Sequence, residues 1–222
     1  MKSPTDRLLD QILSADWAAL LVVDVQNDFC HPDGLFGRAG FDLSGVHSAV
    51  DRMERLIAGA RDAGVPVIFI RIVHDITTNS DAWIHRNAQQ RADACVAGTW
   101  GAEFYRVRPA PDDVVITKRR YSPFVGTDLE YVLRAAKRRS LLIAGVATNI
   151  CVEQALRDGF MRDYHVVLIE DCAGAYNPSS HSSTVENVRS FLGRVVDLET
   201  VRDCWRQRPR PLVSPAGDDQ ND

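Results

Sequence analysis

The sequence lacks the features that mark membrane-spanning, secreted, zinc-binding and nucleic-acid-binding proteins. No apolar run reaches the roughly 20 residues that a membrane helix needs, and the opening, MKSPTDRLLDQILSADW, has acidic residues where a signal peptide has an apolar core. The 5 cysteines are widely spaced, without a CxxC pair that would indicate zinc. The net charge of −4 gives no basic excess of the kind that nucleic acids and anionic membranes select. We therefore expect a cytoplasmic protein that has neither nucleic acid nor membrane as a partner.

The composition is that of an ordinary globular protein. Hydrophobic residues make up 45% of the 222 residues and charged residues 25%, which is enough apolar chain for one α/β domain. No internal repeat and no linker rich in proline, glycine or serine divides the chain. We expect a single domain over 1–205, with an N-terminal helix or arm at 1–16, followed by a disordered polar tail at 206–222.

Short apolar runs alternate with stretches of helical periodicity. The runs are apolar throughout, as in a sheet that is covered on both faces. The alternation predicts an α/β fold, with right-handed crossovers and a parallel sheet between two helical layers. Segment 74–98 is polar and mixed, and we expect it to be partly helical. The expected strands are 18–23, 65–73, 113–117, 140–144, 165–169 and 195–198, and the expected helices are 46–61, 128–137, 149–163 and 181–192.

Polar residues of complementary chemistry follow three of these strands. Asp24 directly follows the first strand, Lys118 follows the third, and Cys151 stands just past the fourth, at the start of a helix. The carboxyl ends of parallel strands lie at one edge of a sheet, so we expect the three side chains to meet in one crevice. Each has an ordinary alternative as a turn residue, a solvated cation or a packed small side chain. Their joint occurrence favours a functional site.

A carboxylate, a cation and a thiol together are suited to acyl transfer. A thiol with a pKa of ~8.5 is mostly protonated at neutral pH, and both Lys118 and the positive end of a helix would favour the thiolate of Cys151. Asp24 would take the thiol proton and return it to a leaving nitrogen. Backbone N–H groups at the start of the helix would hold the oxyanion. The set predicts hydrolysis of an amide or ureide carbonyl without a cofactor.

Three separated motifs carry a resemblance to a known superfamily. They are LLVVDVQNDF at 20–29, ITKRRYSPF at 116–124 and GVATNICVEQALRDGF at 145–160. In this order they resemble the isochorismatase-like cysteine hydrolases over roughly 18–201. The resemblance implies a three-layer α/β/α fold around a six-stranded parallel sheet in the order 3-2-1-4-5-6.

The resemblance also assigns roles to individual residues. It implies that Asp24, Lys118 and Cys151 form the catalytic triad. It implies an oxyanion hole made by the backbone N–H groups of Ala147 and Cys151. A non-proline cis peptide is implied between Val146 and Ala147. The superfamily is usually oligomeric, so the resemblance further implies a homo-oligomer, either a dimer or a tetramer.

Differences between this sequence and individual branches of the superfamily restrict the range of expected substrates. Isochorismatases proper lack the nucleophilic cysteine, so Cys151 favours an amide-type substrate. Nicotinamidases carry an Asp-x-His metal site after the second strand, whereas 71–77 reads RIVHDIT, so we expect neither a metal nor a cofactor. The chain most resembles the branch of ureidoacrylate amidohydrolase, N-carbamoylsarcosine amidase and biuret hydrolase. Ureido or carbamoyl compounds are therefore the first choice, although ureidoacrylate amidohydrolases have an Asn and a Trp where this chain has Ile72 and His74.

Further side chains are candidates for contact with the small-molecule substrate. An arginine among them would bind a substrate carboxylate through a bidentate pair. The sequence leaves the roles of Trp83, Trp100 and Arg120 open, and Tyr176 and Asn177 could also reach the crevice. The substrate-binding candidates are Phe29, Arg71, His74 and Tyr121.

Alternatives of other kinds stay open at this stage. The substrate could be a different amide, such as a lactam, a secondary-metabolite amide, biuret or maleamate. A thiol redox protein would use Cys151 without hydrolysis and would need a resolving cysteine, for which Cys172 is the candidate. A catalytically idle scaffold is a third possibility. Whether 74–98 closes over the site as a lid is also open.

Overall fold

The computed structural model describes residues 3–86 and 94–207. A six-stranded sheet forms its centre, and every neighbouring pair of strands is parallel. The order along the sheet is β3-β2-β1-β4-β5-β6, which confirms the predicted fold class and strand order. The strands are β1 (Ala18–Val23), β2 (Val67–Ile72), β3 (Val114–Lys118), β4 (Ser140–Val146), β5 (His165–Gly174) and β6 (Arg194–Val196).

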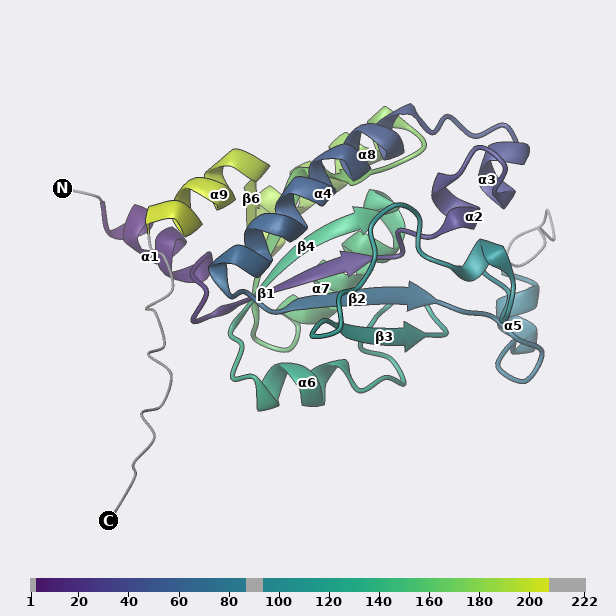
Figure 1. Ribbon diagram of the computed structural model, residues 1–222, viewed down its shortest axis with the longest axis horizontal. Coiled ribbons are helices and arrows are strands. Elements are labelled where there is room, and N and C mark those ends of the chain that lie inside the picture. The colour runs from purple at the N-terminus through teal and green to yellow at the C-terminus, as the bar shows by residue number, and fades with distance from the viewer. Residues whose placement is uncertain (1–2, 87–93, 208–222) are drawn as a thin grey trace, which may run out of the picture.

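Helices cover both faces of the sheet, so the domain has three layers (Figure 1). One core cluster packs α1 (Pro4–Ile12), α4 (Ser44–Ala63) and α9 (Leu198–Gln207) against one face. A second cluster packs α6 (Leu129–Ala135), α7 (Glu153–Phe160) and α8 (Pro178–Asn187) against the other. In residues 3–86 and 94–207 no helix combines the length and the apolar character needed to cross a membrane.

The middle of the sheet is dry on both sides. Every residue of β1 and β4 is buried, which explains why these strands read as continuous apolar runs and not as alternating ones. The crossover from β1 leads to β2 on one side, and β4 begins the other half of the sheet on the opposite side of β1. The order of the strands therefore reverses between β1 and β4, where open α/β sheets form their ligand crevice.

Short helices crowd the end of the molecule beyond the carboxyl ends of the strands. At the right of Figure 1, α2 and α3 lie above this end and α5 lies below it. The helix α5 agrees with the expectation that 74–98 is partly helical, while 87–93 lie outside the described residues. These elements are α2 (Asn27–Cys30), α3 (Leu35–Arg38), α5 (Asp81–Ile84) and the single 3₁₀ turn η1 (Trp100–Ala102).

Two π-helical turns alter the expected helices on the second face. The turn η2 (Thr148–Val152) precedes α7, so the regular α-helix starts later and ends earlier than the expected 149–163. The turn η3 (Val188–Leu192) completes α8. Cys151 therefore lies in a widened turn between β4 and α7, and not in the first turn of a regular α-helix.

The last strand ends earlier than predicted, since a strand was expected at 195–198 and β6 covers Arg194–Val196. The strand β6 stops at Val196, because the Asp197 carboxylate accepts a hydrogen bond from the Thr200 N–H (2.8 Å) and so caps a helix. That helix, α9, buries Leu198, Val201 and Trp205. It runs to Gln207, two residues into the segment expected as a tail, and 208–222 lie outside the described residues.

Candidate active site

Asp24, Lys118 and Cys151 meet at the carboxyl ends of the strands. Asp24 directly follows β1 with a left-handed φ of 52°, and Lys118 is the last residue of β3. The Lys118 Nζ lies 2.7 Å from Asp24 Oδ2, and both side chains are 0% exposed. The same ammonium donates to the backbone oxygens of Arg120 (3.2 Å) and Tyr121 (2.9 Å). The buried cation therefore has three oxygen partners, one of them charged.

The thiol of Cys151 lies beside this ion pair. Burial raises the pKa of Cys151, Lys118 opposes that rise, and Asp24 adds to it, so the net direction is upward. Burial likewise raises the pKa of Asp24 against the lowering effect of Lys118. The sequence led us to expect that the lysine and the helix end favour the thiolate of Cys151. Burial of the sulfur acts in the opposite direction, against the lowering effect of Lys118.

The charges explain where the thiol proton can go. Burial acts to lower the pKa of Lys118, but Asp24 and Cys151 raise it above its ordinary value, so the ammonium is retained. With an ammonium, a carboxylate and a neutral thiol the site is neutral overall. Loss of the thiol proton to solvent would leave a buried net negative charge, whereas transfer of that proton to Asp24 keeps the site neutral. The geometry therefore favours internal proton transfer over a free thiolate.

The segment between β4 and α7 is shaped by its backbone. Gly145 has a φ of 132°, and a Cβ there would stand 2.1 Å from the Val23 carbonyl oxygen. Only glycine lets β4 pass so close to β1 at this point. The peptide bond between Val146 and Ala147 is cis, and the Ala147 carbonyl accepts from the Ile150 N–H at 3.0 Å. This backbone carries Cys151 over the end of β1.

Side chains from α8 hold the same segment from the second face of the sheet. Thr148 is fully buried, and its Oγ1 lies 3.0 Å from His181 Nδ1. The Thr184 hydroxyl donates to the Glu153 carboxylate (2.6 Å), which also pairs with Arg157. The turn that bears Cys151 is thus anchored on both of its flanks.

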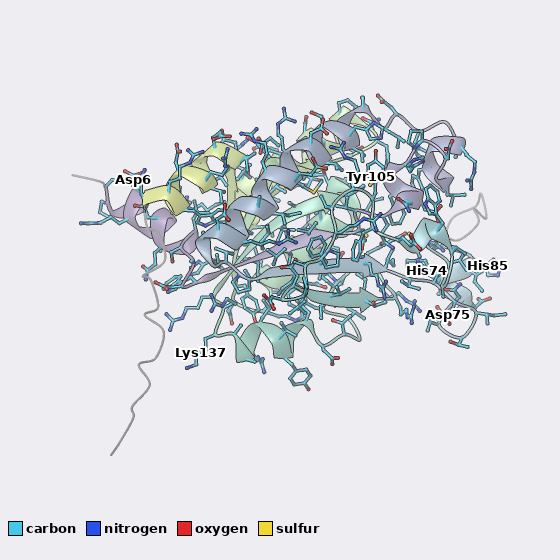
Figure 2. All side chains as sticks on the ribbon, in the orientation of Figure 1. Asp6, His74, Asp75, His85, Tyr105 and Lys137 are labelled. Carbon is cyan, nitrogen blue, oxygen red and sulfur yellow. The ribbon has the colours of Figure 1, made fainter. Side chains whose placement is uncertain are left out.

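A cavity of about 550 Å³ opens in front of Cys151 and Asp24. Of the predicted substrate-binding residues, Phe29, His74 and Tyr121 line it, as do Trp83, Tyr176 and Asn177. Figure 2 places His74 at this end of the sheet. The cavity wall is mostly apolar and aromatic, which is typical of a small-molecule site.

Arg71 does not line the cavity, contrary to the prediction. Successive side chains of a strand point to opposite faces, and it is the neighbouring Ile72 that reaches the cavity. The Arg71 Nε instead donates to Thr117 Oγ1 (3.0 Å) on the adjacent strand. Its role is to join β2 to β3.

The residues whose roles the sequence left open fall into two groups. Trp83 is 7% exposed and belongs to the cavity wall, with the Arg86 and Arg120 guanidinium groups 4.1 Å and 5.0 Å from its ring. Arg120 itself is not among the lining residues, whereas Arg86 is the one described lysine or arginine that lines the cavity. Trp100 is 46% exposed and packs edge-on against His31 away from the cavity.

Sequence reasoning missed much of the cavity wall. The segment between α2 and α4, which contains the short helix α3, brings four side chains to it, and Ile150 and Ser180 also line it. This segment is too short to show periodicity, so the only available signal is the presence of bulky apolar residues within a glycine-rich stretch. The four side chains are those of Leu35, Phe36, Ala39 and Phe41.

Three polar residues after Asp24 brace the cavity. The buried Gln26 amide bonds to Ile72 O, Ile72 N and Ala102 O, each at 2.9 Å. The Asn27 amide donates to the Trp100 carbonyl (2.8 Å). The Asp28 carboxylate accepts from the N–H groups of Leu35 and Cys95. The motif QND therefore ties the ends of β1 and β2 to the surrounding loops.

Cys172 is badly placed to act as a resolving cysteine. It packs in the core cluster with α4 and α9, while Cys151 packs in the cluster on the opposite face. The charged groups that act on the thiol of Cys172 are Asp171, Arg52 and Arg55. Within the described residues no group of three His, Cys, Asp or Glu side chains gathers as a metal site would require.

Comparisons with known proteins identify the family of the chain. The family model of the isochorismatase domain matches residues 18–200. The chain belongs to the isochorismatase family. It is 35% identical to ureidoacrylate amidohydrolase RutB of Methylobacterium radiotolerans over 216 residues, which cover 90% of this chain and 83% of the relative.

Solved structures of the family share the fold. A cysteine hydrolase from Pseudomonas syringae pv. phaseolicola superposes with a TM-score of 0.76 and 26% identity, covering 87% of this chain and 94% of that one. N-carbamoylsarcosine amidase from Thermoplasma acidophilum gives a TM-score of 0.68 and 26% identity, covering 82% and 97%.

Proposed function

We propose that this isochorismatase-family protein is a cysteine amidohydrolase that cleaves a C–N bond of a small linear amide, acting through an acyl-enzyme on Cys151. The supporting observation is the buried Lys118–Asp24 ion pair of 2.7 Å beside the Cys151 thiol at the wall of a cavity. Hydrolysis of C–N bonds other than peptide bonds is the chemistry that this set performs, and relatives of this chain are named amidohydrolases.

In the first half-reaction the Cys151 sulfur attacks the carbonyl carbon, and its proton passes to Asp24. A C–S bond forms and the carbonyl oxygen becomes an oxyanion, which the backbone N–H groups of Ala147 and Cys151 hold. Such donors contribute about 3–4 kcal/mol to lowering the barrier. The C–N bond then breaks, and Asp24 gives its proton to the leaving nitrogen. Lys118 keeps its charge throughout and holds Asp24 in place.

In the second half-reaction water adds to the thioester or thiocarbamate. Asp24 takes a proton from the water and returns it to the Cys151 sulfur as the C–S bond breaks. If a ureide is attacked at its carbamoyl carbon, ammonia leaves first and the released carbamate decays to carbon dioxide and an amine. Each proton that Asp24 accepts is passed on, so the enzyme ends in its starting state without a metal or a cofactor.

Ureido and carbamoyl compounds are the proposed substrate class. The similarity to RutB and to N-carbamoylsarcosine amidase supports this choice. The cavity volume of about 550 Å³ also favours the alternative of a larger amide, such as a lactam or a secondary-metabolite amide, because a simple ureide would fill little of it. The position of Cys172 on the opposite face of the sheet argues against the redox alternative.

We also propose that the protein works as a homo-oligomer, a dimer or a tetramer. Large apolar side chains are exposed on the second helical face, with Tyr131 at 75%, Met161 at 77% and Phe191 at 77%. Large apolar residues that are exposed on one face are candidates for an interaction surface. Light scattering coupled to size-exclusion chromatography would measure the mass, and a monomer at all concentrations would contradict the proposal.

The test of the function is ammonia release from a panel of ureidoacrylate, N-carbamoyl amino acids, biuret, maleamate and nicotinamide. We expect turnover of at least one compound that Cys151→Ala abolishes and that a chelator leaves intact. Cys204→Ala is the matched control, because Cys204 lies on α9 with its thiol facing the Asp10 carbonyl and away from the cavity. Turnover that survives in Cys151→Ala, or that a chelator removes, would overturn the mechanism.

A further inference from the structure

One side of the cavity is an aromatic wall made by Phe36, Phe41 and Tyr176. The Phe36 ring lies 4.9 Å from Tyr176 in a stacked arrangement and 4.8 Å from Phe41, and Phe41 lies 5.3 Å from Tyr176. All three residues line the cavity that Cys151 also lines. Phe29 joins the wall to the catalytic end, with its ring 5.3 Å from Phe36.

The aromatic wall is held in place by contacts that leave its rings available. The Tyr176 hydroxyl donates to the Phe29 carbonyl (3.1 Å), so its polar end is satisfied by backbone. The short helix α3, which bears Phe36, is held by the hydrogen bond that Leu35 N donates to the Asp28 carboxylate (3.0 Å). At Gly34 a Cβ would stand 2.1 Å from the Asn27 carbonyl oxygen, so the loop packs against α2 without a gap. The wall is therefore built before any ligand arrives.

The three rings are only partly buried, and they face the cavity. Apolar ring surface in contact with water is unfavourable, and a flat apolar group placed against it would be stabilised by burial and by ring stacking. A simple ureide with a short polar chain would leave the ring surface of the aromatic wall in contact with water. The cavity volume of about 550 Å³ falls within the range of about 300–1,000 Å³ that accommodates ligands of drug size.

We propose that the substrate carries, beyond its scissile carbonyl, a planar apolar group about the size of a six-membered ring, which lies against the aromatic wall. This inference rests on the proposed amide hydrolysis and specifies its substrate class. The aromatic wall then acts in selectivity, because its contact with the ring stabilises ring-bearing substrates and gives nothing to their methyl counterparts.

The test uses ureides that differ only by a phenyl ring, namely N-benzylurea against N-methylurea and N-carbamoylphenylalanine against N-carbamoylalanine. We expect kcat/KM to be at least about tenfold higher for the ring-bearing member of a pair that is turned over. Phe36→Ala should lower this ratio at least about tenfold. Phe160→Ala, which removes a 42% exposed ring at the end of α7 that does not line the cavity, is the matched control and should leave the ratio unchanged.

A binding measurement keeps this inference separate from the proposed function. Calorimetric titration of Cys151→Ala with the same pairs should give a Kd that is at least about tenfold lower for the ring-bearing member. Phe36→Leu retains apolar bulk without a ring, and when it is added to Cys151→Ala the difference in Kd between the two members should become smaller. Hydrolysis of the ureides without any preference for the ring would overturn the inference and leave the function standing. Ring preference in binding without any hydrolysis would support the subsite and count against the function. Equal Kd values within each pair would overturn the inference whether or not hydrolysis occurs.

Discussion

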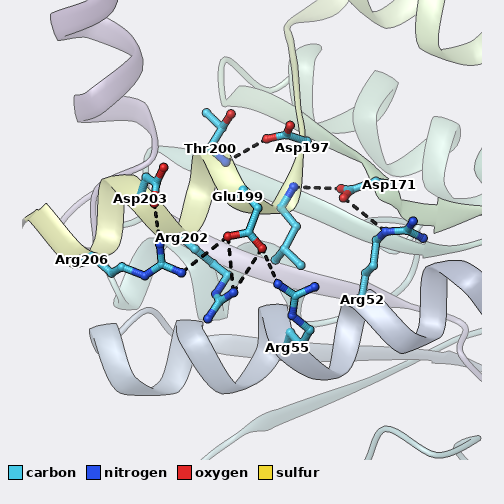
Figure 3. A network of polar contacts seen from close by, with 10 residues as sticks. Arg52, Arg55, Asp171, Asp197, Glu199, Thr200, Arg202, Asp203 and Arg206 are labelled. Carbon is cyan, nitrogen blue, oxygen red and sulfur yellow. Dashed lines mark hydrogen bonds and ion pairs between the residues drawn. The ribbon is translucent and has the colours of Figure 1, made fainter.

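Ion pairs in two regions of the molecule differ most in how deeply they are buried. At the candidate active site, Lys118 and Asp24 form a pair in which both side chains are 0% exposed. At the other region, on the outer side of α4 and α9, Glu199 pairs with Arg55, Arg202 and Arg206 (Figure 3). The Glu199 and Arg55 side chains are 51% and 54% exposed.

The titration of the two carboxyl groups shows what burial does. For Asp24 burial dominates and raises the pKa despite an ammonium at 2.7 Å. For Glu199 desolvation also acts to raise the pKa, but the hydrogen bond and charge of Arg202, together with Arg55 and Arg206, bring it below its ordinary value. Water and salt screen the exposed network, which makes it weak. The buried pair is strongly coupled, as the proposed proton transfer from Cys151 to Asp24 requires.

The largest effect is expected from Asp24→Asn. The amide cannot accept the Cys151 proton, so kcat should fall by about 10²–10⁴-fold. Lys118 would also remain buried without its counter-charge, which costs about 3–5 kcal/mol of unfolding free energy. Steady-state kinetics and urea unfolding measure the two losses. A variant with near-normal stability and activity would show that Asp24 is neither the base nor the partner of Lys118.

A double variant separates structure from chemistry at the buried pair. In Asp24→Asn combined with Lys118→Met neither charge of the buried pair remains, and we expect it to regain most of the about 3–5 kcal/mol of stability lost in Asp24→Asn. Its activity should stay as low as that of the single variant. Urea unfolding of both proteins in parallel makes the comparison. Recovered turnover, or a double variant less stable than the single one, would contradict the strong coupling of the two charges.

The pH dependence of kcat/KM should report the raised pKa values. Activity requires Asp24 as a carboxylate, so it should be lost as pH falls through a midpoint above ~4, the ordinary value for this group. Because the pKa of the Cys151 thiol is also raised, no rise in activity is expected near ~8.5, where an ordinary thiol ionises. A rate that climbs with a midpoint near ~8.5 would identify a thiolate formed by loss of its proton to solvent as the reactive form.

The smallest effect is expected from Glu199→Gln in the exposed network. The three arginines remain solvated after the change, and no group is left buried without a partner. The urea midpoint should stay within the scatter of repeat measurements, and kcat/KM should not change. A loss of stability comparable to that of Asp24→Asn would show that the contrast between the two regions is not one of burial.

The sequence predicts the fold well where the hydrophobic pattern is strong. The strands β1 and β4 are apolar at almost every position and were located to within two residues. The helix α9 was missed because the stretch from Val195 to Leu198 has the pattern of a strand. Capping by Asp197, a local side-chain contact, converts its last position into the start of a helix.

The candidate site could be predicted in its chemistry and only partly in its surroundings. Asp24, Lys118 and Cys151 stand at strand ends, so a parallel sheet brings them together whatever the loops do. The aromatic wall depends on how 35–41 folds back over the strand ends, which no periodicity encodes. The upward shift in the pKa of Cys151 likewise depends on how deeply the folded chain buries the sulfur. The sequence shows only the nearby positive charge of Lys118, which favours a shift in the opposite direction.

The most direct test of the account is to look for the acyl group on Cys151. The protein would be mixed with a large excess of a turned-over amide, quenched with acid within the first turnovers, and analysed by mass spectrometry of its peptides. We expect the mass of the acyl group on the peptide that contains Cys151, and neither adduct nor turnover in Cys151→Ala. Hydrolysis of the amide that continues undiminished in Cys151→Ala would contradict covalent catalysis by this residue.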